Sequence, residues 1–305
     1  MNVAITGACG LLGAHLAAAL SARHRVVGFD RHPWWGTRPI KLYQGDLADA
    51  MTREGFLADA KPDLLIHCAA MVNVDACEDR PADAYFANGT LTGLIAQAVP
   101  SHCPVVYVTT DGIFRGDMPL QSETDLPCPR TVYGRSKLQG EWEVQLATER
   151  HLIIRTNFFG WSAGLKATSG EWLYRSLVNG EPITLFDDFW FTPVYIVDVV
   201  ERMLALISGG HAGIFHVGGN ERISKYDFAM RLAASAGLST AQVSRGSIAD
   251  AALSAPRPRD MSLNSEKVAS VLGCSAPDCG AGLLRFLADR RCALEVRVAN
   301  LDMIS

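Results

Sequence analysis

The chain has 305 residues, of which 49% are hydrophobic and 20% are charged, as in an ordinary folded protein. This composition excludes wholesale disorder, and the length suits two average domains or one large α/β domain. The net charge of −4 argues against a nucleic-acid partner. No apolar run is long enough to cross a bilayer and no basic leader precedes the first motif, so we expect a cytoplasmic protein without membrane contact.

The first half of the chain alternates short β-branched runs with longer helical patterns, which is typical of βαβ units on a parallel sheet. The strands are apolar throughout, so helices should cover both faces of the sheet. We therefore predict an α/β fold with a Rossmann-like, doubly wound parallel sheet. Its predicted strands are 2–6, 25–30, 63–68, 104–109 and 152–156, and its helices are 11–22, 81–99 and 132–150.

After residue 156 the pattern is looser and predicts a second, smaller unit. We expect residues 1–156 to form a dinucleotide-binding domain, with further sheet elements contributed from about 183–217. Residues 157–290 are expected to form mainly a substrate-binding α/β lobe, and 291–305 a C-terminal extension. The elements predicted in this half are strands near 183–186 and 214–217 and helices near 197–207, 225–236 and 282–290.

The eight cysteines are scattered without the Cys-x-x-Cys spacing of a metal site, and no histidine completes a set around Cys274 and Cys279. In an intracellular chain such cysteines are reduced thiols. We therefore predict no bound metal.

A glycine-rich segment, TGACGLLG, lies between the first predicted strand and the first predicted helix. Its first glycine permits a tight turn, the second lets backbone amides approach a pyrophosphate, and the third lets the helix pack closely on the sheet. The helix start then offers N–H groups to the anion. The cofactor-binding residues predicted here are Gly7, Cys9, Gly10, Leu11, Leu12 and Gly13.

Asp30 ends the second predicted strand, near the position where a carboxylate binds the ribose of a dinucleotide. Its charge favours NAD, whereas the adjacent Arg31 and His32 could bind the 2′-phosphate of NADP. The sequence therefore predicts NADP or NAD without choosing between them. Asp46 either contacts the adenine edge or is a simple turn aspartate, and we place Asp46 and Leu47 among the cofactor-binding residues.

Tyr133 and Lys137 lie four residues apart on the predicted helix 132–150, so the phenol and the ammonium share one face. The ammonium should lower the pKa of the phenol and allow proton transfer near neutral pH. The alternative is that Tyr133 is a core aromatic, which the glycine motif makes less favourable. Thr110, at the carboxyl edge of the fourth strand, either polarises a substrate carbonyl or caps the following turn.

Together these motifs resemble those of the extended short-chain dehydrogenases/reductases and, more narrowly, of the dTDP-4-dehydrorhamnose reductase family. The resemblance spans roughly residues 1–290, and its most specific part is the block YGRSKLQGE from Tyr133 to Glu141, after Glu123 and Pro129. Further matching positions are 68–70, Val74, Asp75, Glu78, Asn88, 110–114, Gly116, Asp125, Arg155, Thr156, Thr192, Pro193, Asp198, 215–218, Ser224, Arg257, Pro258 and Leu263.

The resemblance implies hydride transfer from reduced NADP or NAD to the C4 carbonyl of a nucleotide-linked 4-keto-6-deoxy sugar. Thr110 would orient the carbonyl, Tyr133 would donate the proton, and Lys137 would hold the cofactor ribose and tune the phenol. Trp190 either stacks on the substrate or packs at the lobe interface. The family pattern further implies a homodimer, cofactor contacts at Ala69 and Ala70, and substrate contacts at Val72, Asp111, Asn157, Phe158 and Arg257.

Two departures from the family pattern bear on the reaction. Gly112 follows Asp111 where related dehydratases carry a second carboxylate, which argues against dehydratase activity. The stretch 157–161 (NFFGW) partly resembles the epimerase pattern, so the sugar pocket is expected to differ. The alternatives are a nucleotide-sugar epimerase that recycles NAD, and a cofactor-binding regulatory subunit without turnover, the role of similar proteins that serve methionine adenosyltransferase.

Overall fold

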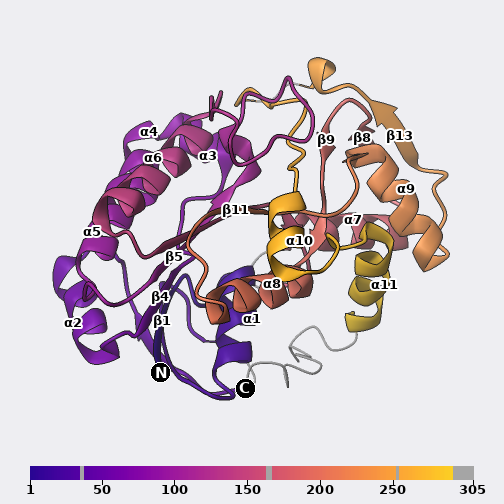
Figure 1. The fold of residues 1–305 in the computed structure, drawn as a ribbon. Helices are drawn as coiled ribbons and strands as arrows, with labels where there is room; N and C mark the ends of the chain where they lie inside the picture. The colour runs from indigo at the N-terminus through magenta and orange to yellow at the C-terminus, as the bar shows by residue number, and fades with distance from the viewer. Residues whose placement is uncertain (35–37, 163–166, 252–253, 291–305) are drawn as a thin grey trace.

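A computed structural model describes residues 1–34, 38–162, 167–251 and 254–290, and a seven-stranded sheet forms its centre (Figure 1). The strand order is β11-β6-β5-β4-β1-β2-β3, and every neighbouring pair is parallel. The order reverses between β1 and β4, the point where open α/β sheets bind ligands. The predicted doubly wound, Rossmann-like fold is therefore confirmed. The strands are Asn2–Thr6 (β1), Arg25–Asp30 (β2), Lys41–Gln44 (β3), Leu64–His67 (β4), Val105–Thr110 (β5), His151–Thr156 (β6) and Gly213–Val217 (β11).

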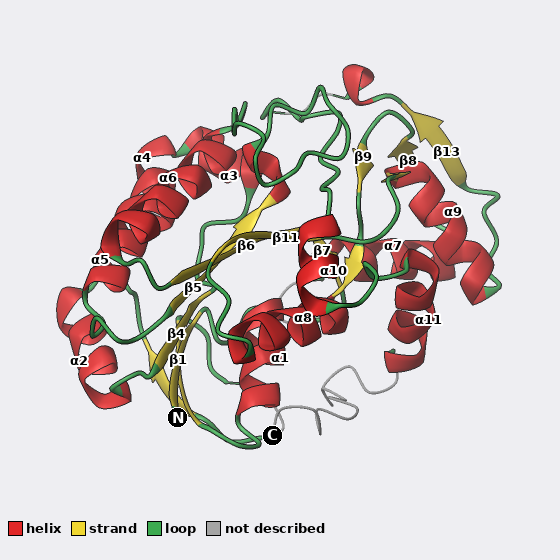
Figure 2. Cartoon of the chain, viewed as in Figure 1, coloured by secondary structure: helices red, strands yellow, loops and turns green. Residues whose placement is uncertain are grey.

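Helices cover both faces because successive strand residues point to opposite sides. Val3 and Ile5 belong to the core under α1 and α8, whereas Ala4 between them belongs to the core under α2, α5 and α6. Figure 2 shows these helical layers on either side of the sheet. The first layer contains Leu11–Leu20 (α1), Ile196–Ser208 (α8) and Glu266–Leu272 (α10). The second contains Ala50–Ala60 (α2), Val74–Asp79 (α3), Pro81–Tyr85 (α4), Leu91–Gln97 (α5) and Val132–Ala147 (α6).

A smaller lobe, on the right in Figure 1, is built from the later part of the chain. Aromatic side chains fill its core, where Trp161 stacks on Phe286 with ring centroids 4.4 Å apart. Its strand pairs are Ile183–Phe186 (β8) with Val243–Gly246 (β13), Trp190–Phe191 (β9) with Ile223–Ser224 (β12), and Val194–Tyr195 (β10) with Phe158–Phe159 (β7). Its helices are Ser169–Asn179 (α7), Lys225–Ala236 (α9) and Cys279–Asp289 (α11).

The structure differs from the sequence prediction in three places. Of the range 183–217, only β11 joins the main sheet, because Ile183–Phe186 pairs with β13 in the smaller lobe. The predicted helix 81–99 is divided into α4, a π-helical turn at Phe86–Thr90 and α5. Several elements, among them β3, α2, α7 and α10, have no predicted counterpart. The expected C-terminal extension, 291–305, lies outside the described residues.

Within the described ranges, no helix has the length and apolar character needed to span a membrane. The same part of the chain contains no group of three or more His, Cys, Asp or Glu placed to hold a metal. Its cysteines are free thiols.

Candidate active site

A cavity of about 1210 Å³ lies at the carboxyl ends of the central strands. The glycine-rich turn, the ends of β2, β4, β5 and β6, and the first turns of α6 form its walls, with Ser162, Thr168 and Ser169 added from the smaller lobe. Every predicted site residue lines this cavity except Trp190 and Arg257. Sequence motifs far apart in the chain thus meet in one place.

The glycine-rich turn packs so closely on the neighbouring backbone that Gly7 and Gly13 leave no space for a side chain. Gly7 has a φ of +67°, and a Cβ there would lie 2.7 Å from the amide nitrogen of Ala69. A Cβ at Gly13 would collide with the carbonyl oxygen of Gly7. Helix α1 starts after Gly10 without a side-chain cap, so the N–H groups of its first turn face the cavity as an anion site. This geometry fits the pyrophosphate of a dinucleotide.

Asp30 holds the glycine-rich turn against the end of β2. Its carboxylate accepts hydrogen bonds from the backbone N–H groups of Cys9 and His32, each at 2.9 Å. Arg31 lies exposed on the cavity wall beside it. Asp46 accepts a hydrogen bond from the backbone N–H of Ala48 at 2.9 Å, as a turn aspartate does, and also lines the cavity.

Tyr133 lies in the first turn of α6, where the Thr131 hydroxyl caps the helix by accepting the N–H of Gly134 at 2.9 Å. Burial raises the pKa of Tyr133 above its ordinary value, and the charge of Asp111 adds to this, although the Thr110 hydroxyl acts in the opposite direction. The prediction that the Lys137 ammonium lowers this pKa is therefore wrong, because burial raises it and the ammonium is not among the groups that shift it. The phenol keeps its proton at neutral pH.

Lys137 lies one turn further along α6 and is 3% exposed. Its Nζ donates to the carbonyl oxygen of Val108 at 2.8 Å and lies 4.2 Å from the ring centroid of Tyr107. Burial lowers the pKa of Lys137 to about 7, although the charges of Cys68 and Glu141 act against this. The Lys137 ammonium therefore has a fixed position, and its pKa is close to neutral pH.

Thr110, Asp111 and Asn157 form a chain of hydrogen bonds beside the phenol. The Thr110 hydroxyl accepts the N–H of Gly112 at 3.1 Å and donates to Asp111 at 3.0 Å, and Asn157 donates to the other oxygen of Asp111 at 2.6 Å. Burial raises the pKa of Asp111 to about 6, although these hydrogen bonds and the Lys225 ammonium oppose it. The Asp111 carboxyl group therefore lines the cavity with a pKa close to neutral pH.

Trp190 and Arg257 lie elsewhere. The Trp190 ring is covered by the guanidinium of Arg222, 4.0 Å from its centroid. The Arg257 guanidinium contacts both carboxylate oxygens of Asp75, at 3.0 and 2.9 Å. The predicted contacts of Trp190 and Arg257 with substrate therefore remain predictions.

Several cavity residues have no counterpart in the sequence prediction. His67 at the end of β4 is one; its Nδ1 lies 2.6 Å from the hydroxyl of Thr6, and its Nε2 lies 3.1 Å from that of Thr92. Thr168 and Ser169, at the start of α7, are others. The capping pattern Thr168-x-x-Glu171 was a usable signal for that helix start, whereas a histidine in an apolar strand gives no signal of its own.

A family model described as the RmlD substrate binding domain matches residues 1–292. The chain belongs to this family. Among curated proteins, a probable low-salt glycan biosynthesis reductase, Agl14, of Haloferax volcanii is 33% identical over 91% of this chain and 94% of its own length. The RmlD-family match thus extends over both the sheet domain and the smaller lobe.

Two further proteins are similar to this chain over most of its length. A crystal structure of dTDP-4-dehydrorhamnose reductase from Bacillus anthracis in complex with NADP has a TM-score of 0.83 at 26% identity, covering 94% of this chain and 98% of that one. Methionine adenosyltransferase 2 subunit beta of Pongo abelii is 29% identical over 95% of this chain and 89% of its own length. The proteins similar to this chain therefore include reductases and a subunit of another enzyme.

Proposed function

We propose that this protein is an NADPH- or NADH-dependent reductase of a nucleotide-linked 4-keto-6-deoxy sugar. Its membership of the RmlD family and its similarity to dTDP-4-dehydrorhamnose reductases support the proposal. The observation that carries it is that Thr110, Tyr133 and Lys137 line one cavity together with the glycine-rich turn. The turn and the uncapped start of α1 would hold the pyrophosphate, and the bound cofactor supplies the hydride.

The side chains are suited to the remaining steps. The Tyr133 phenol, protonated at neutral pH, donates its proton to the carbonyl oxygen as the carbon receives hydride. The Thr110 hydroxyl orients that oxygen by turning its proton from Asp111 to the substrate carbonyl, and the Lys137 ammonium stabilises the phenolate left on Tyr133. Because Val108 already fixes the ammonium, little reorganisation accompanies the transfer.

The test is a spectrophotometric assay at the nicotinamide band with NADPH or NADH and a dTDP-4-keto-6-deoxy sugar generated in situ. We expect oxidation of the cofactor that depends on the sugar. Cofactor binding without any oxidation would contradict the proposal. A new sugar epimer formed without net consumption of cofactor would instead identify an epimerase.

A cofactor-binding regulatory subunit is the second candidate, favoured by the similarity to methionine adenosyltransferase 2 subunit beta. That role needs the glycine-rich turn but not proton donation by Tyr133. Stable co-purification with a methionine adenosyltransferase, together with no turnover of any keto-sugar tested, would support this candidate over the reductase.

A further inference from the structure

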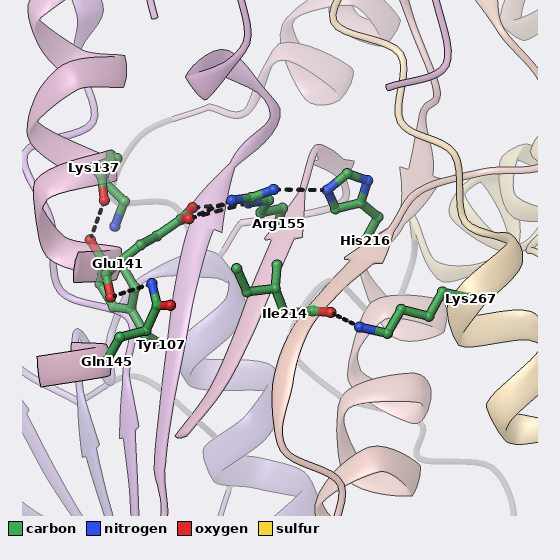
Figure 3. Close-up of polar contacts among 8 residues, drawn as sticks. All are labelled: Tyr107, Lys137, Glu141, Gln145, Arg155, Ile214, His216 and Lys267. Carbon is green, nitrogen blue, oxygen red and sulfur yellow. Dashed lines mark hydrogen bonds and ion pairs between the residues drawn. The ribbon is translucent and has the colours of Figure 1, made fainter. Parts of the chain in front are cut away.

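A buried ion pair ties the helix that carries Tyr133 and Lys137 to the sheet (Figure 3). Glu141 lies one turn after Lys137 on α6, and its carboxylate accepts hydrogen bonds from Arg155 on β6, from Nε at 3.2 Å and from Nη2 at 2.7 Å. Neither side chain is more than 3% exposed. Since removing two charges from water costs much of what their attraction returns, stability alone is a weak reason for this pair.

The far side of Arg155 is held as well. Its Nη1 lies 3.3 Å from Nε2 of His216, its register partner on β11, and Nδ1 of His216 lies 3.1 Å from the carbonyl oxygen of Gln121. Burial lowers the pKa of His216 to about 3, so the ring is neutral. A guanidinium only donates, so Nε2 is the acceptor and Nδ1–H donates to Gln121. The backbone N–H of His216 donates to Glu123 at 2.8 Å, which fixes the loop before α6 too.

The pair joins the helix of Tyr133 and Lys137 to the strands that end at Thr110 and Thr156. Arg155 is in register with Thr109 on β5, one residue before Thr110. Glu141 is one turn of α6 after Lys137, and Figure 3 shows its carboxylate directed from that helix toward Arg155. A displacement of α6 along the sheet would break the bidentate contact.

We propose that the Glu141–Arg155 pair is a positioning device for Lys137, which fixes α6 against β5 and β6 and places a negative charge beside the ammonium. The inference rests on the proposed function, because Lys137 is the residue through which the pair would act. Glu141 and Arg155 are positioning residues and make no contact with substrate in this proposal.

The surroundings of Lys137 leave Glu141 as the anion that acts on it. The charges of Cys68 and of Glu141 both raise the pKa of Lys137 against the larger, lowering effect of burial, but burial keeps the Cys68 thiol protonated at pH 7. At pH 7 the other titratable groups around Lys137 in the described part of the chain are neutral, because burial lowers the pKa of His67 and raises that of the thiol and the phenols. These groups are His67, Cys68, Tyr107 and Tyr133.

The test is an NMR titration of the lysine side chains, labelled with ¹³C at Cε. The chain has six lysines, so a Lys137→Met variant assigns the signal. In the wild-type protein Lys137 should titrate near pH 7. In Glu141→Gln we expect its midpoint to fall by about 1 pH unit. Lys225, whose pKa burial lowers to about 8 and whose Nζ lies 3.4 Å from the ring centroid of Phe191, is the internal reference and should not move.

A second variant covers the case in which an unpaired Arg155 prevents folding. Glu141→Gln/Arg155→Met removes both charges and should fold, and its Lys137 midpoint should also fall, because Arg155 does not contribute to the shift of Lys137. Asp198→Asn is the control, because it breaks an ion pair with Arg285 in the other half of the molecule. In this variant the titration midpoint of Lys137 should stay at the wild-type value.

A Lys137 midpoint that stays at the wild-type value in either folded variant would overturn the proposal. The titration needs neither cofactor nor substrate, so its failure is distinct from a failure of the proposed reductase activity. Where turnover is measurable, the alkaline limb of kcat should move to lower pH by the same amount in Glu141→Gln, with the dissociation constant of NADPH at pH 6 changed less than about two-fold.

Discussion

Tyr133 and Lys137 stand one helical turn apart, and burial shifts their pKa values in opposite directions. It raises that of the phenol and lowers that of the ammonium to about 7, because an apolar environment disfavours the charged form of each. The phenol therefore enters a reaction with its proton in place. The Lys137 ammonium is close to its titration midpoint at pH 7, and the charge of Glu141 helps to keep it protonated.

We expect Tyr133→Phe to reduce kcat by about 10²–10⁴-fold, the usual contribution of a positioned proton donor. The dissociation constant of NADPH, measured by fluorescence, should change little, because the phenyl ring keeps the shape of the cavity wall. Tyr174→Phe is the control, since Tyr174 packs against Trp161 in the smaller lobe outside the cavity lining. Full activity in Tyr133→Phe would remove the proton-donor role.

Arg31 should decide how well the 2′-phosphate of NADP is accepted. The Asp30 carboxylate is engaged by two backbone N–H groups, whereas the Arg31 guanidinium lies exposed on the cavity wall. We expect Arg31→Ala to lower kcat/KM for NADPH by about ten-fold or more and to leave that for NADH nearly unchanged, because a guanidinium binds phosphate with charge-assisted hydrogen bonds. Equal losses with both cofactors would show that Arg31 does not reach the phosphate.

At the scale of elements, α6 lies so close to its neighbours that only glycine fits at position 140. A Cβ there would collide with the carbonyl oxygen of Asn88 and the hydroxyl of Tyr107. We expect Gly140→Ala to lower the free energy of unfolding by about 1–3 kcal/mol, the usual cost of overpacking. On α2, a Cβ at Gly55 meets nothing within 4 Å, so Gly55→Ala should raise it by about 0.5–1 kcal/mol. Urea unfolding measures both, and a Gly140→Ala protein as stable as Gly55→Ala would contradict this packing.

The elements that sequence patterns predicted are those with long, regular apolar signals. The central strands and α1, α8 and α9 are of this kind, whereas α6 has no regular apolar stripe and is marked by the Tyr133–Lys137 motif. Strand β3 has four residues at the sheet edge, two exposed and two half-buried in the order exposed, half-buried, half-buried, exposed, which leaves no alternation to detect. The break at Phe86–Thr90 is equally invisible, because it accompanies close packing in which a Cβ at Gly89 would meet the Gln139 side chain on α6.

At the scale of the whole molecule, the residues of the site likewise fall into those that sequence patterns predict and those that they do not. Residues in continuous motifs, such as the glycine-rich turn and Tyr133–Lys137, were predicted from spacing because the sheet topology alone brings them to one edge. Which residues the smaller lobe adds to the cavity depends on how that lobe packs against the sheet domain. Thr168 therefore lines the cavity without having been predicted, whereas Trp190 lies under Arg222 instead.

The same burial that shapes the site should make the molecule sensitive to acid. The pKa values of His67 and His216 fall from 6.5 to about 3 on folding, so between these values the unfolded chain binds more protons than the folded one. Their contribution to stability is therefore complete above pH 6.5 and is lost as the pH falls, at up to about 1.4 kcal/mol per pH unit for each histidine. Urea midpoints at pH 7, 6 and 5 should show this decline, and His67→Gln should weaken it because glutamine does not titrate. His102→Gln, at an exposed position, should leave the decline as it is. If His67→Gln kept the full wild-type decline, the acid sensitivity would have to come from groups other than this histidine.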